Sequence, residues 1–291
     1  TVTDERVAAL RQAGITRLSL GIQQLDDDVL KKNGRVHLVA DVERAYPIIH
    51  QAGFDVVNID LMVGMIGESE RTFFQSLERV IDMQPDSVTI YQLEIPLNTP
   101  LYRDLRDGSL AEPPPSWDVK RARVETAFER LEQAGYSVRS AYAAVRDPER
   151  HRFVYQDAQY HGADLLGLGA ASFSYLGGVH AQNKASLRSY LEAVTDGALP
   201  IGRAHALTDD ERLIREFVLQ LKLGRAGADY FLSKFDVDIR QRFVEPLTRM
   251  TQSGWLTIDE SGITMTRRGL IRIDRLIPGF YPPRHRDVRY S

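Results

Sequence analysis

One local pattern recurs three times along this chain and limits its fold more than any other feature. A helical stretch closes on Gln-Ala-Gly and a short apolar strand follows, at Gln12-Ala13-Gly14, Gln51-Ala52-Gly53 and Gln133-Ala134-Gly135. Each glycine suits the left-handed backbone conformation that commonly ends a helix. The repeats therefore report architecture, a helix leading into a strand, and carry no chemistry of their own.

The strands that follow alternate with helices of about 12 to 18 residues. We predict strands at 17–23, 56–62, 87–94 and 136–139, and helices after the N-cap Thr3, over 70–83 and over 117–134. This alternation implies crossover connections and an α/β fold with a parallel sheet, open or closed into a barrel. In either form the site lies at the carboxyl ends of the strands, where Gln23, Asp60 and Glu94 fall.

Composition excludes several classes of function. The balance of 37 basic and 40 acidic residues supplies no field for holding nucleic acid. No apolar run approaches the roughly 20 residues that span a bilayer, and the first residues lack a signal-peptide pattern, so we expect a cytoplasmic protein without a membrane partner. The chain has no cysteine, which excludes disulfides, cysteine nucleophiles and thiolate metal sites within these residues, and we assign no metal ligand.

From Leu207 the pattern changes, and we expect a division into domains 1–204 and 205–291. The second domain is predicted to hold helices at 209–221, 239–252 and 267–277, with Pro246 a possible break, and a hairpin at 256–258 and 263–265. This order is typical of winged-helix modules, many of which bind DNA. From Leu207 onward, 15 Lys+Arg against 12 Asp+Glu leave a net charge of only +3, which does not favour that function.

The polar strand ends, together with Arg35 in the loop after the first strand, suit a ligand with hydroxyl, ammonium and carboxylate groups. Carboxylates accept from ribose hydroxyls or an amine, glutamine offers a donor and an acceptor, and arginine forks onto a carboxylate. Any one of these residues could instead be a helix cap or a loop residue. By themselves they predict a nucleoside-like or amino-acid-like ligand.

Several short segments resemble, in order and spacing, the oxygen-independent coproporphyrinogen III oxidases and their radical S-adenosylmethionine relatives, and the resemblance covers nearly the whole chain. These segments are Arg17-Leu18-Ser19-Leu20-Gly21-Ile22-Gln23, Gly34-Arg35, Asn58-Ile59-Asp60-Leu61-Met62-Val63-Gly64, Tyr91-Gln92-Leu93-Glu94 with Asn98-Thr99-Pro100, and Leu166-Gly167-Leu168-Gly169-Ala170.

This resemblance implies a partial (β/α) barrel of the radical S-adenosylmethionine type, lacking its first strands, with a smaller winged-helix-like carboxy-terminal domain. It implies S-adenosylmethionine and a 4Fe-4S cluster as cofactors. By position, Gln23, Arg35 and Asp60 match family residues that contact S-adenosylmethionine. Glu94 and Phe173 match residues that line the same pocket, Phe173 through its backbone.

The family holds its cluster on a CxxxCxxC loop, and this chain has no such loop. We expect the amino-terminal, cluster-binding part of a parent protein to be missing here, and the fragment alone to be inactive; the alternative is a relative that never had a cluster. The catalytic residues are not identified by the resemblance.

The resemblance implies an oxidoreductase that converts porphyrinogen propionates to vinyls, with a tetrapyrrole as substrate, an electron donor for the cluster and a monomeric state. A radical methyltransferase or cyclopropanase on the same scaffold is an alternative. Another is a haem chaperone, with His151, His161 and His180 as conceivable haem ligands, although that branch matches here only at Tyr160. The fourth hypothesis is a winged-helix regulator.

Overall fold

The computed structural model describes residues 2–95, 99–110 and 112–286, so the predicted motif residue Asn98 lies outside the described part. The described residues form two compact units, 2–152 and 153–286, which are described separately below. The sequence analysis predicts a domain boundary between residues 204 and 205, and that boundary stays a prediction.

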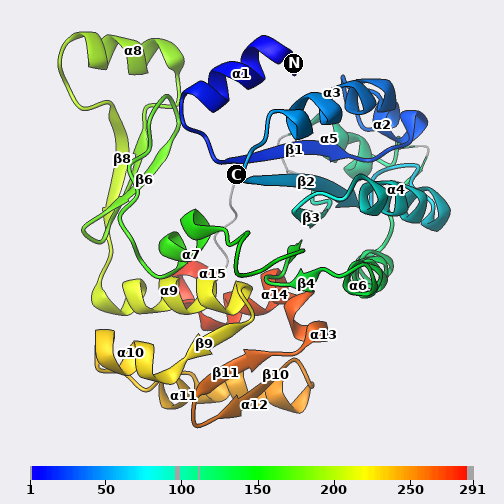
Figure 1. Cartoon of the computed structure of the whole chain (residues 1–291). Coiled ribbons are helices and arrows are strands. Elements are labelled where there is room, and N and C mark those ends of the chain that lie inside the picture. Colours follow the sequence, from blue (N-terminus) through cyan, green and yellow to red (C-terminus); the bar gives the residue numbers. More distant parts are fainter. Residues whose placement is uncertain (1, 96–98, 111, 287–291) are drawn as a thin grey trace. The chain divides into compact units, whose positions relative to one another are not determined.

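The sheet of the first unit has the strand order β1-β2-β3-β5-β4. β1 (Arg17–Gln23), β2 (Val56–Val63) and β3 (Ser87–Gln92) pair in parallel, as Figure 1 shows, which confirms the predicted parallel sheet. The fourth predicted strand, β4 (Ser137–Val138), does not extend that parallel set directly. The unpredicted β5 (Ala143–Val145) lies between β3 and β4 and is antiparallel to both; its three residues are too few to show a period in the sequence.

The helices of the first unit are α1 (Asp4–Gln12), α2 (Asp27–Lys32), α3 (Val39–Gln51), α4 (Glu70–Met83), α5 (Pro100–Arg106) and α6 (Trp117–Gln133). The predicted cap of α1 is confirmed, because the Arg6 backbone amide donates to Thr3 Oγ1. The glycines that follow α1, α3 and α6 all have positive φ, between 68° and 88°, as the repeated Gln-Ala-Gly pattern predicts.

One face of this sheet forms the core of the first unit. Ile59, Leu61 and Val63 of β2 have no exposed surface, and α4 and α6 pack against β2 and against each other. Because successive side chains of a strand point to opposite faces, the intervening residues of β2 face the other way. The helices therefore cover one face of the sheet, and the other face is left to polar side chains.

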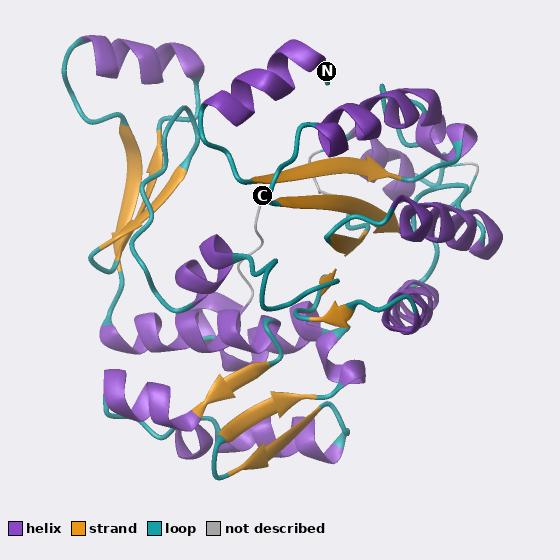
Figure 2. Cartoon of the chain, in the orientation of Figure 1, coloured by secondary structure: helices purple, strands orange, loops and turns teal. Residues whose placement is uncertain are grey.

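The second unit begins with α7 (Val154–Tyr160) and an antiparallel sheet in the order β6-β7-β8, seen in orange in Figure 2. The strands are β6 (Phe173–Leu176), β7 (Val179–Asn183) and β8 (Ile201–Ala206). We did not predict this sheet. The glycine-containing run before Phe173 is a loop that returns to the sheet through a bridge between Leu165 and Tyr175.

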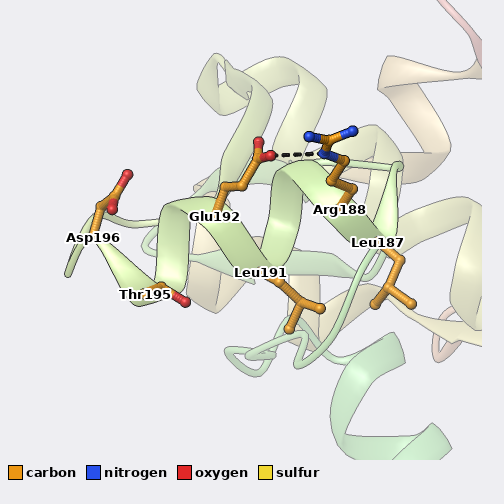
Figure 3. Close-up of a pocket in the computed structure, with 6 residues that line it drawn as sticks. All are labelled: Leu187, Arg188, Leu191, Glu192, Thr195 and Asp196. Carbon is orange, nitrogen blue, oxygen red and sulfur yellow. Dashed lines mark hydrogen bonds and ion pairs between the residues drawn. The ribbon is translucent and has the colours of Figure 1, made fainter.

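α8 (Leu187–Thr195) lies between β7 and β8 in the chain and keeps an apolar side in solvent. Leu187 and Leu191, one helical turn apart, are 64% and 52% exposed and point to the same side of the helix in Figure 3. Arg188 and Glu192 form an ion pair of 3.0 Å elsewhere on the helix surface. Nothing among the described residues of the second unit covers the two leucines.

The rest of the second unit is helical with one small sheet, in the order β10-β11-β9. Its elements are α9 (Asp209–Lys222), β9 (Arg225–Gly227), α10 (Ala228–Phe235), α11 (Ile239–Arg242), α12 (Val244–Gln252), β10 (Leu256–Asp259), β11 (Gly262–Met265), α13 (Arg267–Leu270), α14 (Ile273–Leu276), η1 (Ile277–Phe280) and α15 (Pro283–Arg286). The predicted hairpin is confirmed.

Two predicted helices of this region are each broken in two. The 239–252 helix breaks at Phe243 and not at Pro246, because Pro246 falls in the first turn of α12, where its missing amide hydrogen costs nothing. The 267–277 helix is divided between α13 and α14. None of the helices among the residues that the structure describes is long and apolar enough to cross a membrane.

Phe217 is the centre of the aromatic core of the second unit. Its ring stacks on Phe243 with centroids 4.5 Å apart and meets Phe231 and Phe280 edge to face at 5.8 and 5.0 Å. Phe217 and Phe231 have no exposed surface. These rings join α9, α10, η1 and the junction between α11 and α12.

We predict that Phe217→Ala lowers the free energy of unfolding of the second unit by about 3–5 kcal/mol, because it removes a fully buried ring and leaves a cavity. Urea denaturation followed by far-UV circular dichroism measures the loss. Leu232→Ala on α10 is the control, since that side chain is 53% exposed and should change stability little. Equal losses in the two variants would contradict this view of the core.

Candidate functional site

The face of the first sheet that the helices leave uncovered carries a row of polar residues. In the strand register Ser19 lies beside Asn58, Asn58 beside Ser87, and Asp60 beside Thr89. All five therefore come from neighbouring positions on three parallel strands and point to the same face. The sequence analysis proposed only Asp60 of this set as a site residue. The alternation of polar residues with period two in each strand could have indicated the other four.

Asp60 is held by two side chains of this row. Asn58 Nδ2 donates to Asp60 Oδ1 at 2.7 Å, and Ser19 Oγ donates to Asp60 Oδ2 at 3.0 Å. Burial raises the pKa of Asp60, while these hydrogen bonds and the positive charge of Arg17 act in the opposite direction. We predicted Asp60 at a strand end, but it is the fifth of eight residues in β2 and lies within the polar face.

Gln23 is the last residue of β1, as predicted, and its backbone is unusual. It has φ of 58°, a value rare for a residue with a side chain, and the Gln24 amide donates to the Ile22 carbonyl across it at 2.7 Å. Its side-chain amide folds back over Gly21, where a Cβ atom would collide with it. The turn at Gln23 ends β1, and the side-chain amide of Gln23 lies over the end of that strand.

Arg35 follows α2 and reaches the end of β2. Its Nη2 lies 3.8 Å from the sulfur of Met62, the next residue after Asp60 on the polar face. Nearby, His37 Nε2 lies 3.0 Å from the Ile22 carbonyl, and since a carbonyl can only accept, this nitrogen carries the proton. The loop is thereby attached to the carboxyl ends of β1 and β2, and the structure brings Arg35 and Asp60 to one region.

Glu94 lies beyond the sheet rather than within it. β3 ends at Gln92, two residues earlier than predicted, and Glu94 is exposed. The buried Lys120 of α6 is close by: its Nζ donates to the Leu93 carbonyl at 2.7 Å. Burial lowers the pKa of Lys120, and the negative charges of Glu94 and Glu68 oppose that effect.

A buried ion pair that the sequence reading missed lies where the loop after β2 meets α6. The Glu68 side chain has no exposed surface, and Arg123 Nη1 donates to its Oε1 at 2.6 Å. The Gly64 amide donates to the same oxygen at 3.0 Å. Burial raises the pKa of Glu68, against the effect of these donors. The pair fixes the turn at Gly64 that follows the polar strand β2.

Phe173 belongs to the second unit, where it begins β6 and is 55% exposed. Its backbone carbonyl packs against Gly167, at which a Cβ atom would not fit. The structure therefore groups Gln23, Arg35, Asp60 and Glu94 in the first unit. The assignment of all five residues to one ligand stays a prediction.

Two family models match this chain. The first, described as "Radical SAM superfamily", matches residues 1–80, which include β1, β2 and the Arg35 loop. The second, "HemN C-terminal domain", matches residues 207–272. The resemblance to the radical SAM superfamily is confirmed.

Curated relatives show the same likeness over most of the chain. The oxygen-independent coproporphyrinogen III oxidase of Synechocystis sp. is 27% identical over 298 residues, covering 96% of this chain and 63% of the relative. That of Escherichia coli is 27% identical over 283 residues, covering 91% and 60%. The heme chaperone HemW of Bacillus subtilis is 25% identical over 269 residues, covering 91% and 69%. The chain thus spans between 60% and 69% of the length of these relatives.

A solved structure shows the fold. The coproporphyrinogen III oxidase (HemN) of Escherichia coli superposes with a TM-score of 0.79 at 24% identity, covering 96% of this chain and 67% of the other. The mixed α/β fold with its parallel sheet matches this radical SAM fold.

We predict that Arg123→Met lowers the free energy of unfolding of the first unit by about 3–5 kcal/mol at neutral pH, because it leaves the buried Glu68 carboxylate without its partner. The pKa of Glu68, already raised, should rise further in this variant. Protonation then neutralises Glu68 in the folded state, so the deficit should shrink as pH falls towards the raised pKa. Urea denaturation at several pH values measures both effects.

Two controls separate this charge effect from general damage. The double variant Arg123→Met/Glu68→Gln should lose less stability than Arg123→Met alone and should show less pH dependence. Arg188→Met removes the exposed ion pair of α8 and should cost no more than about 1 kcal/mol. A deficit in Arg123→Met that does not change with pH would contradict the role assigned to Glu68.

Proposed function

We propose that this chain carries the S-adenosylmethionine-binding part of a radical SAM protein of the coproporphyrinogen III oxidase type. The observation that carries the proposal is the Asp60 carboxylate, held on the polar face of the sheet with Arg35 and Gln23 at the adjacent strand ends. The superfamily match over residues 1–80 covers these three residues. The oxidase relatives favour a porphyrinogen as substrate and a partial (β/α) barrel with a winged-helix-like second domain.

The residues present fit S-adenosylmethionine. Asp60 has both oxygens tied to donors on the sheet side and can accept further hydrogen bonds from ligand hydroxyls. Arg35 offers a fork of donors for a carboxylate, and Gln23 offers one donor group and one acceptor. Glu94, exposed next to Lys120, is a further acceptor at this edge. When bound, S-adenosylmethionine supplies the 5′-deoxyadenosyl group from which radical SAM proteins generate their radical.

The residues present do not fit a 4Fe-4S cluster of the usual kind, because the chain has no cysteine to supply thiolate ligands. The part of the reaction that this chain performs by itself is therefore binding and orientation of S-adenosylmethionine. That these 291 residues alone lack oxidase activity stays a prediction, as do the electron donor and the monomeric state. The nucleotide sequence that precedes the Thr1 codon tests whether a CxxxCxxC loop belongs to the protein.

We predict that the chain binds S-adenosylmethionine and that Asp60→Asn weakens binding at least tenfold, because a hydrogen bond to a charged acceptor contributes about 1.5–3 kcal/mol. Isothermal titration calorimetry measures both affinities. Asp55→Asn makes the same chemical change at an exposed residue just before β2 and should bind normally. No binding at millimolar ligand, or equal affinities for the two variants, would contradict the proposal.

Haem binding is a second candidate function, favoured by the likeness to the Bacillus subtilis haem chaperone and by the geometry of His161. His161 Nδ1 lies 2.7 Å from the Asp157 carbonyl and must carry the proton, which leaves the lone pair on Nε2. In metal-binding histidines, a backbone carbonyl or carboxylate commonly accepts a hydrogen bond from the ring nitrogen that does not bind the metal, and this fixes the tautomer in the same way. Of the two other histidines considered, His151 is buried beside Asp86, and His180 accepts from Arg215 Nε at 3.1 Å.

We predict for this second candidate that haem titration produces a shifted Soret band which His161→Ala abolishes. His50→Ala, at an exposed position on α3, is the control and should leave the band unchanged. A Soret band of equal position and intensity in the His161→Ala variant would remove His161 as a ligand.

A further inference from the structure

The polar row on the first sheet is more than a set of neighbours, because its hydrogen bonds all run in one direction. Arg17 Nη2 donates to Ser87 Oγ at 3.0 Å, and Ser87 Oγ donates to Asn58 Oδ1 at 2.6 Å. Asn58 Nδ2 then donates to Asp60 Oδ1 at 2.7 Å. The chain of bonds begins at a cation on β1, passes through β3 and ends at a carboxylate on β2.

The direction of these hydrogen bonds follows from the chemistry of the two end groups, Arg17 and Asp60. A guanidinium can only donate and an ionised carboxylate can only accept. Ser87, which receives a hydrogen bond from Arg17, has its own hydroxyl hydrogen left for Asn58. If the Asn58 amide were turned round, its oxygen would face the Asp60 carboxylate, and its nitrogen would face the hydroxyl that donates to it. Arg17 and Asp60 therefore fix the orientation of the Asn58 amide between them.

The Asn58 amide uses all of its hydrogen-bonding capacity inside this network. Its oxygen accepts from Ser87 and, at 3.1 Å, from Thr89 Oγ1, and its nitrogen donates to Asp60 and, at 2.8 Å, to Ser19 Oγ. Asn58 is 2% exposed, so water does not compete for these bonds. A buried amide whose donors and acceptors are all paired is held rigidly, and hydrogen bonds linked in this way strengthen one another.

The consequence reaches Asp60. One oxygen accepts from Asn58 and the other from Ser19, so both are held by neighbouring side chains of the polar row, and Thr89 also favours the ionised form of Asp60. Burial by itself would favour the neutral acid and raises the pKa of Asp60. The donors and the Arg17 charge act against burial. The other charged or titratable groups near Arg17 are Asp86 and Tyr91.

We propose that Arg17, Ser87 and Asn58 form a one-way hydrogen-bond relay that keeps the Asp60 carboxylate ionised and oriented to accept hydrogen bonds from a ligand. Asn58 and Ser87 are positioning residues, because they act on the ligand only through Asp60. The relay rests on the proposed function for the identity of that ligand, but its effect on Asp60 exists without it.

The relay is tested first in the ligand-free chain by a carbon-13 NMR pH titration of aspartate side-chain carboxyls, with the Asp60 signal assigned by its loss in Asp60→Asn. In Asn58→Leu the pKa of Asp60 should rise by about one unit, a tenfold change in its protonation equilibrium. Ser87→Ala should raise it by a smaller amount, since the direct donor Asn58 stays in place, and Arg17→Gln should also raise it, because it removes both the bond to Ser87 and the positive charge near Asp60. Ser137→Ala, on exposed β4, is the matched control and should leave it unchanged.

Thr89 gives a second check that does not depend on the folding of Asn58→Leu. Thr89→Val removes a hydroxyl that donates to the Asn58 oxygen and also favours the ionised form of Asp60 directly, so it should raise the pKa of Asp60, whereas Thr89→Ser keeps the hydroxyl and should restore the native value. An unchanged pKa in Ser87→Ala would overturn the relay, because Ser87 reaches Asp60 only through Asn58. The same rise in Thr89→Ser as in Thr89→Val would contradict the role of the Thr89 hydroxyl in the network.

Binding of S-adenosylmethionine by the same variants separates the relay from the proposed function. Well above the pKa of Asp60, Ser87→Ala should bind nearly as tightly as the native chain, and on acidification it should lose affinity at a higher pH. A shifted pKa without any S-adenosylmethionine binding would support the relay and contradict the proposed function. Binding whose pH profile is identical in both proteins would overturn the relay's role in ligand binding.

Discussion

The Asn58 amide lies where three parallel strands meet, and the arrangement of the candidate site depends on it. Its four hydrogen bonds join β1, β2 and β3 across the face of the sheet that the helices leave uncovered. A buried amide has a free energy cost unless its donors and acceptors are all paired. The parallel register places a matching group at each position, so the sheet can keep a polar interior without that cost.

The two faces of this sheet carry different side chains, apolar on one and polar on the other. The apolar face, with the fully buried Ile59 and Leu61, anchors α4 and α6 and contributes the hydrophobic stabilisation. The polar face carries the candidate site. Alternate residues of β2 form the two faces. A shift of the strand by one residue would therefore move Asp60 off the polar face and bury polar groups against the helices. This coupling explains how a carboxylate can be kept in the middle of a strand rather than on a mobile loop.

The edge of the site is built differently from its centre. Gln23 sits on a turn with positive φ, and the Arg35 loop is attached to the carbonyl of Ile22 through His37. At the far side, the buried Glu68–Arg123 pair fixes the turn after β2. Polar groups near the ends of the strands are thus held by local backbone geometry and ion pairing, while Asp60 is held by side chains of the sheet.

The sequence by itself determined the alternation of helices and strands in the first unit, the parallel pairing of its first three strands, the hairpin of the second unit and the polar residue types near the strand ends, because these depend on periodicity and on local turn chemistry. Only the tertiary structure decided that Asp60 lies inside β2, that Ser19, Asn58 and Ser87 form one network, and that Glu68 pairs with Arg123 from 55 positions away. It also decided that β5 separates β3 from β4. Register between strands and contacts between distant helices follow from how whole elements pack, and no local pattern records them.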